Sequence, residues 1–394
     1  MRVTPFLLCL PFALAIAAPP AKADQSPEYV GPPVIIPGPP SPPISVRSGA
    51  LAAPMEDTRL HLPDAEATCD GAPLAATYSD PLPAVQRRVG ASYEDTVLAF
   101  SVAADGRTLD IRAVEGATAA SDRLQASLAA WRFPPHARKD CRLIVRWRTV
   151  SVEQADTSDL LTYFAVTRDR GALRDAVAKR LGGPNSDCDD RFGGRRPAVM
   201  AYPDFEKGRR PPPGGRSWTV VRWNIDAEGR NTDIETLGSS GDVDLDAEAR
   251  RTMADSRMRP GPARTGCVYN FYRTGETLEA PPMPPEDQRP DPLQQCPASV
   301  AERFKPQSNL VFPTAFRDRP IEGWALIRFD VAPWGQIGNA AVVEAQPAAA
   351  FGTQALQLVQ SSRASGGFEA GVRCVVPVRY KMPAENAAPE ADQN

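Results

Sequence analysis

Cysteine is the residue type in this 394-residue chain whose number and spacing are most suited to chemistry. Of the seven cysteines, Cys9 lies in an apolar N-terminal stretch, and the other six are spread widely along the chain. Such thiols either bind a metal or form disulfides. We expect no metal site and no cofactor, because no Cys-x-x-Cys pair occurs and the only two histidines are His61 and His136. Six cysteines still allow many disulfide pairings, so the surrounding architecture must select among them.

An internal repeat supplies that architecture. Residues 100–106, 223–229 and 329–335 align without gaps, and each reads aromatic residue, any residue, branched aliphatic residue, three further residues and glycine. Apolar residues alternate upstream of each segment, which is typical of a strand that enters a hairpin. The repeat therefore predicts three copies of one unit, which we number in chain order. Three glycines are predicted to provide a positive φ angle in the turn: Gly106, Gly229 and Gly335.

The cysteines follow the repeat. One cysteine lies 37, 41 and 39 residues before the turn glycine of copies 1, 2 and 3 (106 − 69, 229 − 188, 335 − 296). Another lies 35, 38 and 39 residues after it (141 − 106, 267 − 229, 374 − 335). This regularity predicts one disulfide in each copy, formed in an oxidising compartment. The predicted pairs are Cys69 with Cys141, Cys188 with Cys267, and Cys296 with Cys374.

Each turn is followed by a second strand, then a helix, and then a last strand that begins at a cysteine. The last strands are predicted at residues 141–150, 267–273 and 374–380. Pro377 cannot donate a ladder hydrogen bond, which places the third of them at a sheet edge or a bulge. The predicted fold class is therefore α+β: three tandem small domains, each a three-stranded antiparallel sheet (hairpin, helix, strand) with one helix covering one face.

The N-terminus is typical of a secretory signal peptide. Arg2 precedes an apolar stretch at residues 6–18, and a small-x-small cleavage pattern follows at residues 21–23. The apolar stretch is shorter than the roughly 20 residues that a spanning helix needs. We therefore expect cleavage after residue 23 and export to the periplasm, the alternative being that the segment stays as an inner-membrane anchor.

The domain organisation follows from these elements. Between copies 1 and 2, apolar residues recur at near-helical spacing, which predicts a helix or helix pair that packs on a neighbouring domain. Proline-rich and polar segments flank the copies. The predicted parts are a signal peptide (1–23), a proline-rich disordered segment (24–65), copy 1 (66–153), a helical linker (154–185), copy 2 (186–280), a proline-rich linker (281–293), copy 3 (294–382) and a disordered tail (383–394).

Several motifs of the repeated unit resemble the C-terminal domain of TonB. Copy 2 contains Leu-Gly-Ser-Ser-Gly at residues 237–241 and Leu-Asp-Ala-Glu-Ala at residues 245–249. Copy 1 contains Trp-Arg-Phe-Pro-Pro at residues 131–135, similar to the Trp-Arg-Phe-x-Pro of that family. Copy 3 ends in Val-Pro-Val-Arg-Tyr at residues 376–380. The resemblance covers about two thirds of the chain after residue 23, and it implies three TonB-like domains.

The resemblance implies a binding module in which a partner's short extended segment adds to the last strand of the domain. This is β-augmentation, where main-chain hydrogen bonds give affinity and pockets along the edge give selectivity. The alternative for these positions, equally open from the sequence, is ordinary sheet core. The implied partner-binding residues are Val268, Tyr269, Asn270, Phe271 and Tyr272 in copy 2, and Val375, Val376, Val378 and Tyr380 in copy 3.

The resemblance thus implies a periplasmic TonB-like protein that takes part in TonB-dependent outer-membrane transport by binding transporter segments. The alternative is an envelope adaptor that binds other periplasmic proteins or peptidoglycan without transducing energy. We expect no enzyme, because the two histidines occupy no shared position of the repeat. Nucleic acid is not an expected partner, since Lys plus Arg (45) nearly balances Asp plus Glu (48).

Overall fold

The structure is a computed structural model that describes residues 59–86, 94–116, 121–167, 171–188, 196–285, 288, 304–306, 309–365 and 371–383. All of them belong to one unit that runs from Pro54 to the C-terminus. The predicted signal peptide, most of the first proline-rich segment, most of the second proline-rich linker, nearly all of the tail and Cys296 lie outside the described residues.

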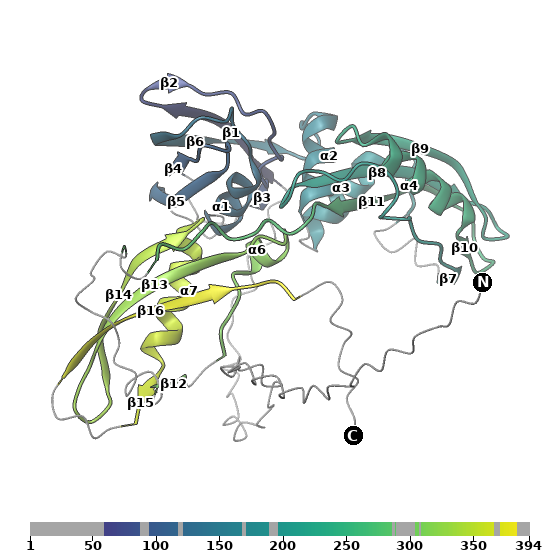
Figure 1. Cartoon of the computed structure of the whole chain (residues 1–394). Helices are drawn as coiled ribbons and strands as arrows, with labels where there is room; N and C mark the ends of the chain where they lie inside the picture. The colour runs from purple at the N-terminus through teal and green to yellow at the C-terminus, as the bar shows by residue number, and fades with distance from the viewer. Residues whose placement is uncertain are drawn as a thin grey trace, which may run out of the picture. The chain divides into compact units, whose positions relative to one another are not determined.

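The same order of hairpin, helix and last strand occurs three times in the described residues (Figure 1). Copy 1 has β4(Thr96–Val102), β5(Thr108–Glu115), α1(Ser121–Ala130) and β6(Arg138–Ser151). Copy 2 has β8(Arg216–Ile225), β9(Asn231–Ser239), α4(Val243–Asp255) and β11(Arg264–Thr274). Copy 3 has β13(Gly323–Val331), β14(Ile337–Gln346), α7(Ala349–Gln360) and β16(Val372–Tyr380). In each copy the first hairpin strand is central, and both neighbours pair with it in antiparallel fashion. The chain is therefore α+β with small antiparallel sheets.

The hairpin turns have the same backbone geometry in all three copies. The φ angles of Gly106, Gly229 and Gly335 are +85°, +84° and +88°. Each glycine carbonyl accepts a hydrogen bond from the chain that follows the helix, at 3.0, 2.8 and 3.0 Å. Four residues after each glycine, an Asp or Asn also has positive φ and forms a bulge against the central strand: Asp110, Asp233 and Asn339.

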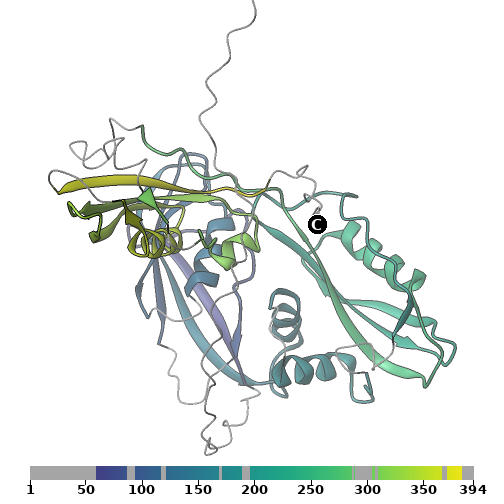
Figure 2. The ribbon, with the colours of Figure 1, turned by 90° about the horizontal axis from the view of Figure 1, so that it is seen from below.

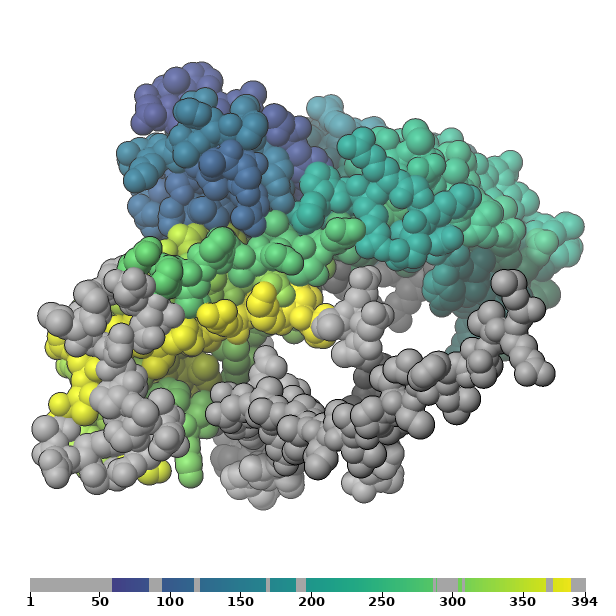
Figure 3. Space-filling view, in the orientation of Figure 1, coloured from purple at the N-terminus to yellow at the C-terminus, as the bar shows by residue number. Residues whose placement is uncertain are grey.

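Copy 1 contains more strands than the sequence predicted. Three further strands, β1(Arg59–Cys69), β2(Ala72–Pro73) and β3(Val85–Gln86), extend its sheet to six strands. The prediction of a three-stranded sheet is wrong for this copy, and so is the assignment of residues 59–65 to a disordered segment. The physical reason is burial, because Leu60 and Leu62 of β1 lie in a hydrophobic core. In the space-filling view the purple N-terminal residues lie directly against the blue remainder of copy 1 (Figure 3).

Copy 2 has helices on both faces of its sheet, where the sequence predicted one helix on one face. Two helices between copies 1 and 2, α2(Thr157–Val166) and α3(Ala172–Gly182), pack opposite α4 (Figure 2). Trp218 and Val220 of β8 belong to the core on the α2–α3 side, and Val221 and Trp223 to the core that includes α4 residues. Both faces of β8 are apolar, so both require cover. A short ladder of β7(Pro197–Val199) and β10(Arg257–Met258) flanks the copy.

Copies 1 and 3 share a hydrophobic core. Ile111 of β5 donates its N–H to the carbonyl of Pro347 at 2.9 Å, and it forms a bridge with Ala348. The core contains Phe100 and Phe133 of copy 1 together with Phe329 and Phe351 of copy 3. Copy 3 also has the short helix α6(Thr314–Arg317) and a ladder of β12(Phe304–Lys305) with β15(Arg363–Ala364). Among the described residues, no helix has both the length and the apolar character needed to cross a membrane.

Candidate partner-binding edge

Disulfides mark the start of the last strand in copies 1 and 2. Cys69 is bonded to Cys141, and Cys188 to Cys267, as the repeat predicted. Both downstream cysteines lie opposite the aromatic residue of the repeat in the central strand. Cys374 has the same place in copy 3, opposite Phe329, and it is also disulfide-bonded. Its predicted partner, Cys296, lies outside the described residues. The repeat therefore fixes where the last strand is cross-linked.

In copy 1 the outer edge of the last strand is occupied by the chain itself. Strand β1 pairs with β6 in antiparallel register from Arg59 opposite Ser151 to Cys69 opposite Cys141, so all 11 residues of β1 take part. Glu66 also forms an ion pair across the ladder with Arg146, at 3.5 Å. The fold thus adds an extended segment to the last strand of one of its own copies.

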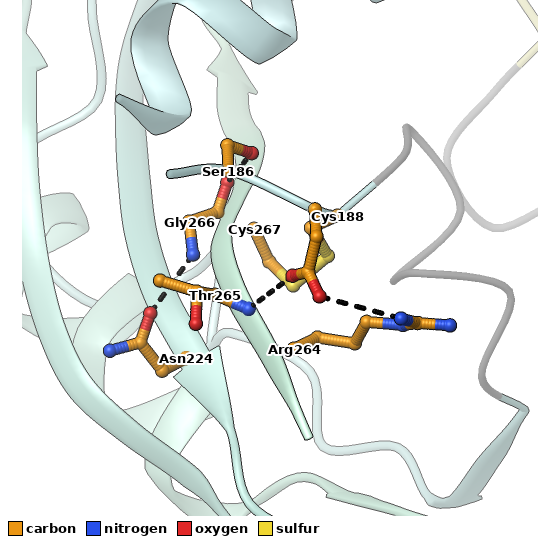
Figure 4. Close-up of a disulfide and its surroundings, with 8 residues drawn as sticks. Ser186, Cys188, Asn224, Arg264, Thr265, Gly266 and Cys267 are labelled. Carbon is orange, nitrogen blue, oxygen red and sulfur yellow. Dashed lines mark hydrogen bonds and ion pairs between the residues drawn. A yellow bond between two sulfur atoms is a disulfide. The ribbon is translucent and has the colours of Figure 1, made fainter. Parts of the chain in front are cut away.

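In copy 2 the segment that ends at Cys188 contacts the start of the corresponding edge (Figure 4). The Asp187 N–H donates to the carbonyl of Thr265 at 3.2 Å, and the Ser186 hydroxyl donates to the carbonyl of Gly266 at 3.0 Å. Beyond Cys267, β11 forms a strand ladder with β8 alone among the described residues. We call residues Val268–Thr274 of β11 the copy-2 edge.

The predicted binding residues of the copy-2 edge divide between the two faces of the sheet. Val268 is 6% exposed and packs in the core with α2 and α3, so its side chain is structural. Asn270 is on the same face, where its amide donates to Ala165 O at 3.2 Å and accepts from Arg174 at 2.9 Å. Tyr269 and Tyr272 are 39% and 38% exposed. These two tyrosines are the edge side chains most open to a partner.

A groove of about 580 Å³ runs along the copy-2 edge. Phe271 is half-buried beside it and packs edge-to-face with Tyr269, with 5.0 Å between the ring centroids. The opposite wall comes from the segment before β8. The residues of this wall and of the far end of the groove could not be selected from the sequence, because they belong to no repeated motif. The lining outside β11 includes Phe205, Glu206, Arg210, Gly275, Glu276, Thr277, Pro320, Met382 and Pro383.

A buried carboxylate fastens the groove wall to α4. The side chain of Glu248 is 4% exposed and accepts hydrogen bonds from Arg251 Nη2 at 2.6 Å, from Lys207 Nζ at 2.8 Å and from the Asp204 N–H at 3.3 Å. The hydrogen bonds from Arg251 and Lys207 lower the pKa of Glu248 to about 2. The carboxylate is therefore ionised at neutral pH and positions Phe205 and Glu206 beside β11.

In copy 3 the predicted edge residues are more buried. Strand β16 lies at the edge of its sheet, where Pro377 is tolerated, and among the described residues it forms a ladder with β13 alone. Its residues Val375, Val376 and Val378 are half-buried. Tyr380 is 1% exposed and donates its hydroxyl to the carbonyl of Phe351 at 3.0 Å, and burial raises its pKa. The interpretation of the Tyr380 side chain as a binding group is wrong, because it belongs to the core.

Comparison with known proteins yields a limited likeness. No protein-family model matches the chain, and no curated protein matches it. Among solved structures, the chain is similar to the solution NMR structure of the Pseudomonas aeruginosa TonB CTD, with 24% sequence identity and a TM-score of 0.19. The match covers 21% of this chain and 89% of that chain.

Proposed function

We propose that this chain is a periplasmic TonB-like binding protein that takes part in outer-membrane transport by β-augmentation. In this proposal an extended segment of a transporter adds to the last strand of a copy. The observation that carries the proposal is the pairing of β1 with β6, because the chain already holds an extended segment of 11 residues on that edge of copy 1. An open strand edge presents main-chain donors and acceptors that suit the same kind of ligand.

The groove at the copy-2 edge supports the proposal. It combines the exposed rings of Tyr269 and Tyr272 with the side of β11 that has no strand partner among the described residues. The wall that Glu248 holds leaves little to order when a ligand binds. The proposed mode of action needs main-chain pairing and side-chain pockets. It therefore needs no catalytic group, metal or cofactor.

The proposed location rests on the N-terminal signal and on the disulfides. A small-x-small cleavage pattern ends at residue 23, and disulfides persist in oxidising compartments such as the periplasm. A segment that is retained would instead anchor the chain in the inner membrane and favour a direct role in energy transduction.

A second candidate function is an envelope adaptor that binds other periplasmic proteins or peptidoglycan. The observation that favours it is a buried network between the copies: Asp80 of copy 1 forms an ion pair with Arg319, which precedes β13, and both side chains are buried. Fixed contacts between copies suit a scaffold, and they are not required for binding at a single edge.

A photo-crosslinking amino acid placed at Tyr272 distinguishes the two functions in cells. We expect a covalent adduct with an outer-membrane transporter, identified by mass spectrometry of its cross-linked peptide. The same amino acid placed at Val114, an exposed position on β5 of copy 1, is the control and should give no such adduct. If adducts form only with other envelope proteins or with peptidoglycan, the result would contradict the transport function and support the adaptor function.

A further inference from the structure

Four charged residues line the copy-2 groove, Glu206, Arg210, Arg273 and Glu276, and the first three have ion-pair partners. Arg210 forms an ion pair with Glu206, and the buried Arg273 lies 3.5 Å from Asp242. Lys381, which precedes Met382 of the lining, pairs with Glu322 at 2.8 Å. The carboxylate of Glu276 is exposed and forms no ion pair or hydrogen bond with the described residues. Among the described residues, Glu276 is therefore the charged lining residue without an ion-pair partner, and it lies just beyond Thr274, at one end of the edge.

The exposed tyrosines favour apolar side chains on both faces of an added strand. Successive side chains of a strand point to opposite faces of its sheet, so Tyr269 and Tyr272 lie on different faces. If a ligand strand pairs with β11, a ligand residue on one face of the sheet can contact Tyr269, and a ligand residue on the other face can contact Tyr272. On copy 1, the added strand β1 likewise has buried side chains on both faces, because the successive residues Leu60, His61 and Leu62 are all buried.

An ion pair across the added strand also has a precedent in copy 1. Glu66 of β1 reaches Arg146 of β6 at 3.5 Å, so a charge on an added strand can meet its counterpart on the copy that receives it. In copy 2 the receiving charge is negative, and its complement on a ligand is a cation.

We propose that the copy-2 groove binds an extended peptide segment that has aromatic or branched apolar residues on both faces of the strand and a Lys or Arg at the end that lies beyond Thr274. This inference rests on the proposed function and specifies its ligand class. The cation pairs with Glu276, while the apolar residues contact Tyr269 on one face of the sheet and Tyr272 on the other.

Fluorescence anisotropy with short peptides tests the inference on the chain without residues 1–23. The probes are labelled peptides of about eight residues, enough to span the edge in extended form, with alternating Val and Phe in the centre. One has Lys first, one has Lys last, and one has Gln at both places. We expect one Lys peptide, selected by strand direction, to bind about two- to five-fold more tightly than the Gln peptide, as for an exposed ion pair.

The variant Glu276→Gln should abolish the preference for lysine and leave the affinity of the Gln peptide unchanged. Glu153→Gln, which neutralises an exposed carboxylate of copy 1, should retain the preference. Equal affinity of all three peptides, or a lysine preference that survives Glu276→Gln, would overturn the charge inference and leave augmentation at β11 intact. Failure of every peptide, including the Gln peptide, to bind would overturn the proposed function as well.

Discussion

At the scale of single residues, the groove depends on side chains that do not touch a ligand. Glu248 holds the Asp204–Lys207 stretch against α4 through two hydrogen bonds, from the Asp204 N–H and the Lys207 ammonium, and Phe205 of this stretch lines the groove. Glu248 belongs to the Leu-Asp-Ala-Glu-Ala stretch at residues 245–249 of copy 2, but the sequence of this stretch does not reveal that role. Its partner Lys207 belongs to the variable segment before β8, and only the folded chain brings the two together.

The contribution of Glu248 should depend on pH. Its pKa falls from 4.5 to about 2 on folding, so the ionised carboxylate stabilises the fold above pH 4.5 and loses this effect as the pH falls toward 2. We expect Glu248→Gln to lower the free energy of unfolding at pH 7, and the difference from wild type to shrink between pH 4.5 and pH 2 in urea titrations. Glu228→Gln, at an exposed turn position, is the control and should have little effect. A difference that stays constant over this range would contradict the assignment.

Gly229 combines positive φ with a close backbone contact. A Cβ atom there would lie 2.0 Å from the carbonyl oxygen of Met258, so a side chain requires the backbone to shift. Gly241 has nearly the same φ, +87°, but open space around it. We expect Gly241→Ala to cost about 1–2 kcal/mol for the left-handed backbone alone, and Gly229→Ala to cost clearly more, as measured by denaturant titration. Equal losses would show that the contact with Met258 is unimportant.

The turn glycines Gly106, Gly229 and Gly335 were predictable because a turn is a local structure that a short motif determines. The bulge residues Asp110, Asp233 and Asn339 were missed, although Asp and Asn are the residue types that most often adopt positive φ after glycine. Their recurrence four residues after each turn glycine was present in the sequence. The sequence does not indicate that Phe205 and Glu276 line the groove, because neither residue belongs to the repeat.

At the scale of elements, the hairpins, the helices and the last strands followed from periodicity, but β1 did not. Its sequence contains Pro63 and alternating acidic residues, which favour disorder when read locally. The strand forms because β6, about 80 residues further along the chain, offers a complete edge. A helix or helix pair that packs on a neighbouring domain was predicted between copies 1 and 2, but not that α2 and α3 cover the second face of the copy-2 sheet, since a helical pattern does not reveal the sheet on which it packs.

The Cys69–Cys141 disulfide should hold β1 on β6. It closes a loop with a sequence separation of 72 residues, and the removal of such a bond costs about 2–5 kcal/mol. In the double variant Cys69→Ala/Cys141→Ala, we expect faster hydrogen exchange at the β1 amides than in the wild type. The matched variant Cys188→Ala/Cys267→Ala should leave β1 unchanged. Unaltered β1 exchange in the first variant would mean that strand pairing alone holds this segment.

At the scale of the whole molecule, a buried polar network connects the three copies. Asp80 accepts a 2.5 Å hydrogen bond from the Tyr78 hydroxyl and pairs with Arg319 of copy 3, whose guanidinium also donates to Ser127 at 3.0 Å. The main-chain N–H of Arg216, at the start of copy 2, reaches Asp80 at 3.3 Å. A repeat alignment identifies the copies but carries no information about contacts between them, so this network could not be predicted.

Removal of one member of the buried pair should destabilise the chain strongly. We expect Asp80→Ala to cost about 3–5 kcal/mol, because it leaves the Arg319 charge buried without a partner. The double variant Asp80→Leu/Arg319→Met should lose less than Asp80→Ala, since no charge then remains buried. Denaturant titration of the full chain measures both. A double variant at least as unstable as the single one would show that the ion pair is not what joins the copies.

The central claim is that an extended segment of a partner adds to the copy-2 edge. Hydrogen–deuterium exchange of the chain, with and without a saturating concentration of the tighter-binding Lys peptide, tests it most directly. We expect slower exchange on binding at amides between Val268 and Thr274 that face the open side of β11, and no change in β6, where β1 already occupies the edge. Binding that leaves the β11 amides unprotected, or that protects β6 instead, would contradict the claim.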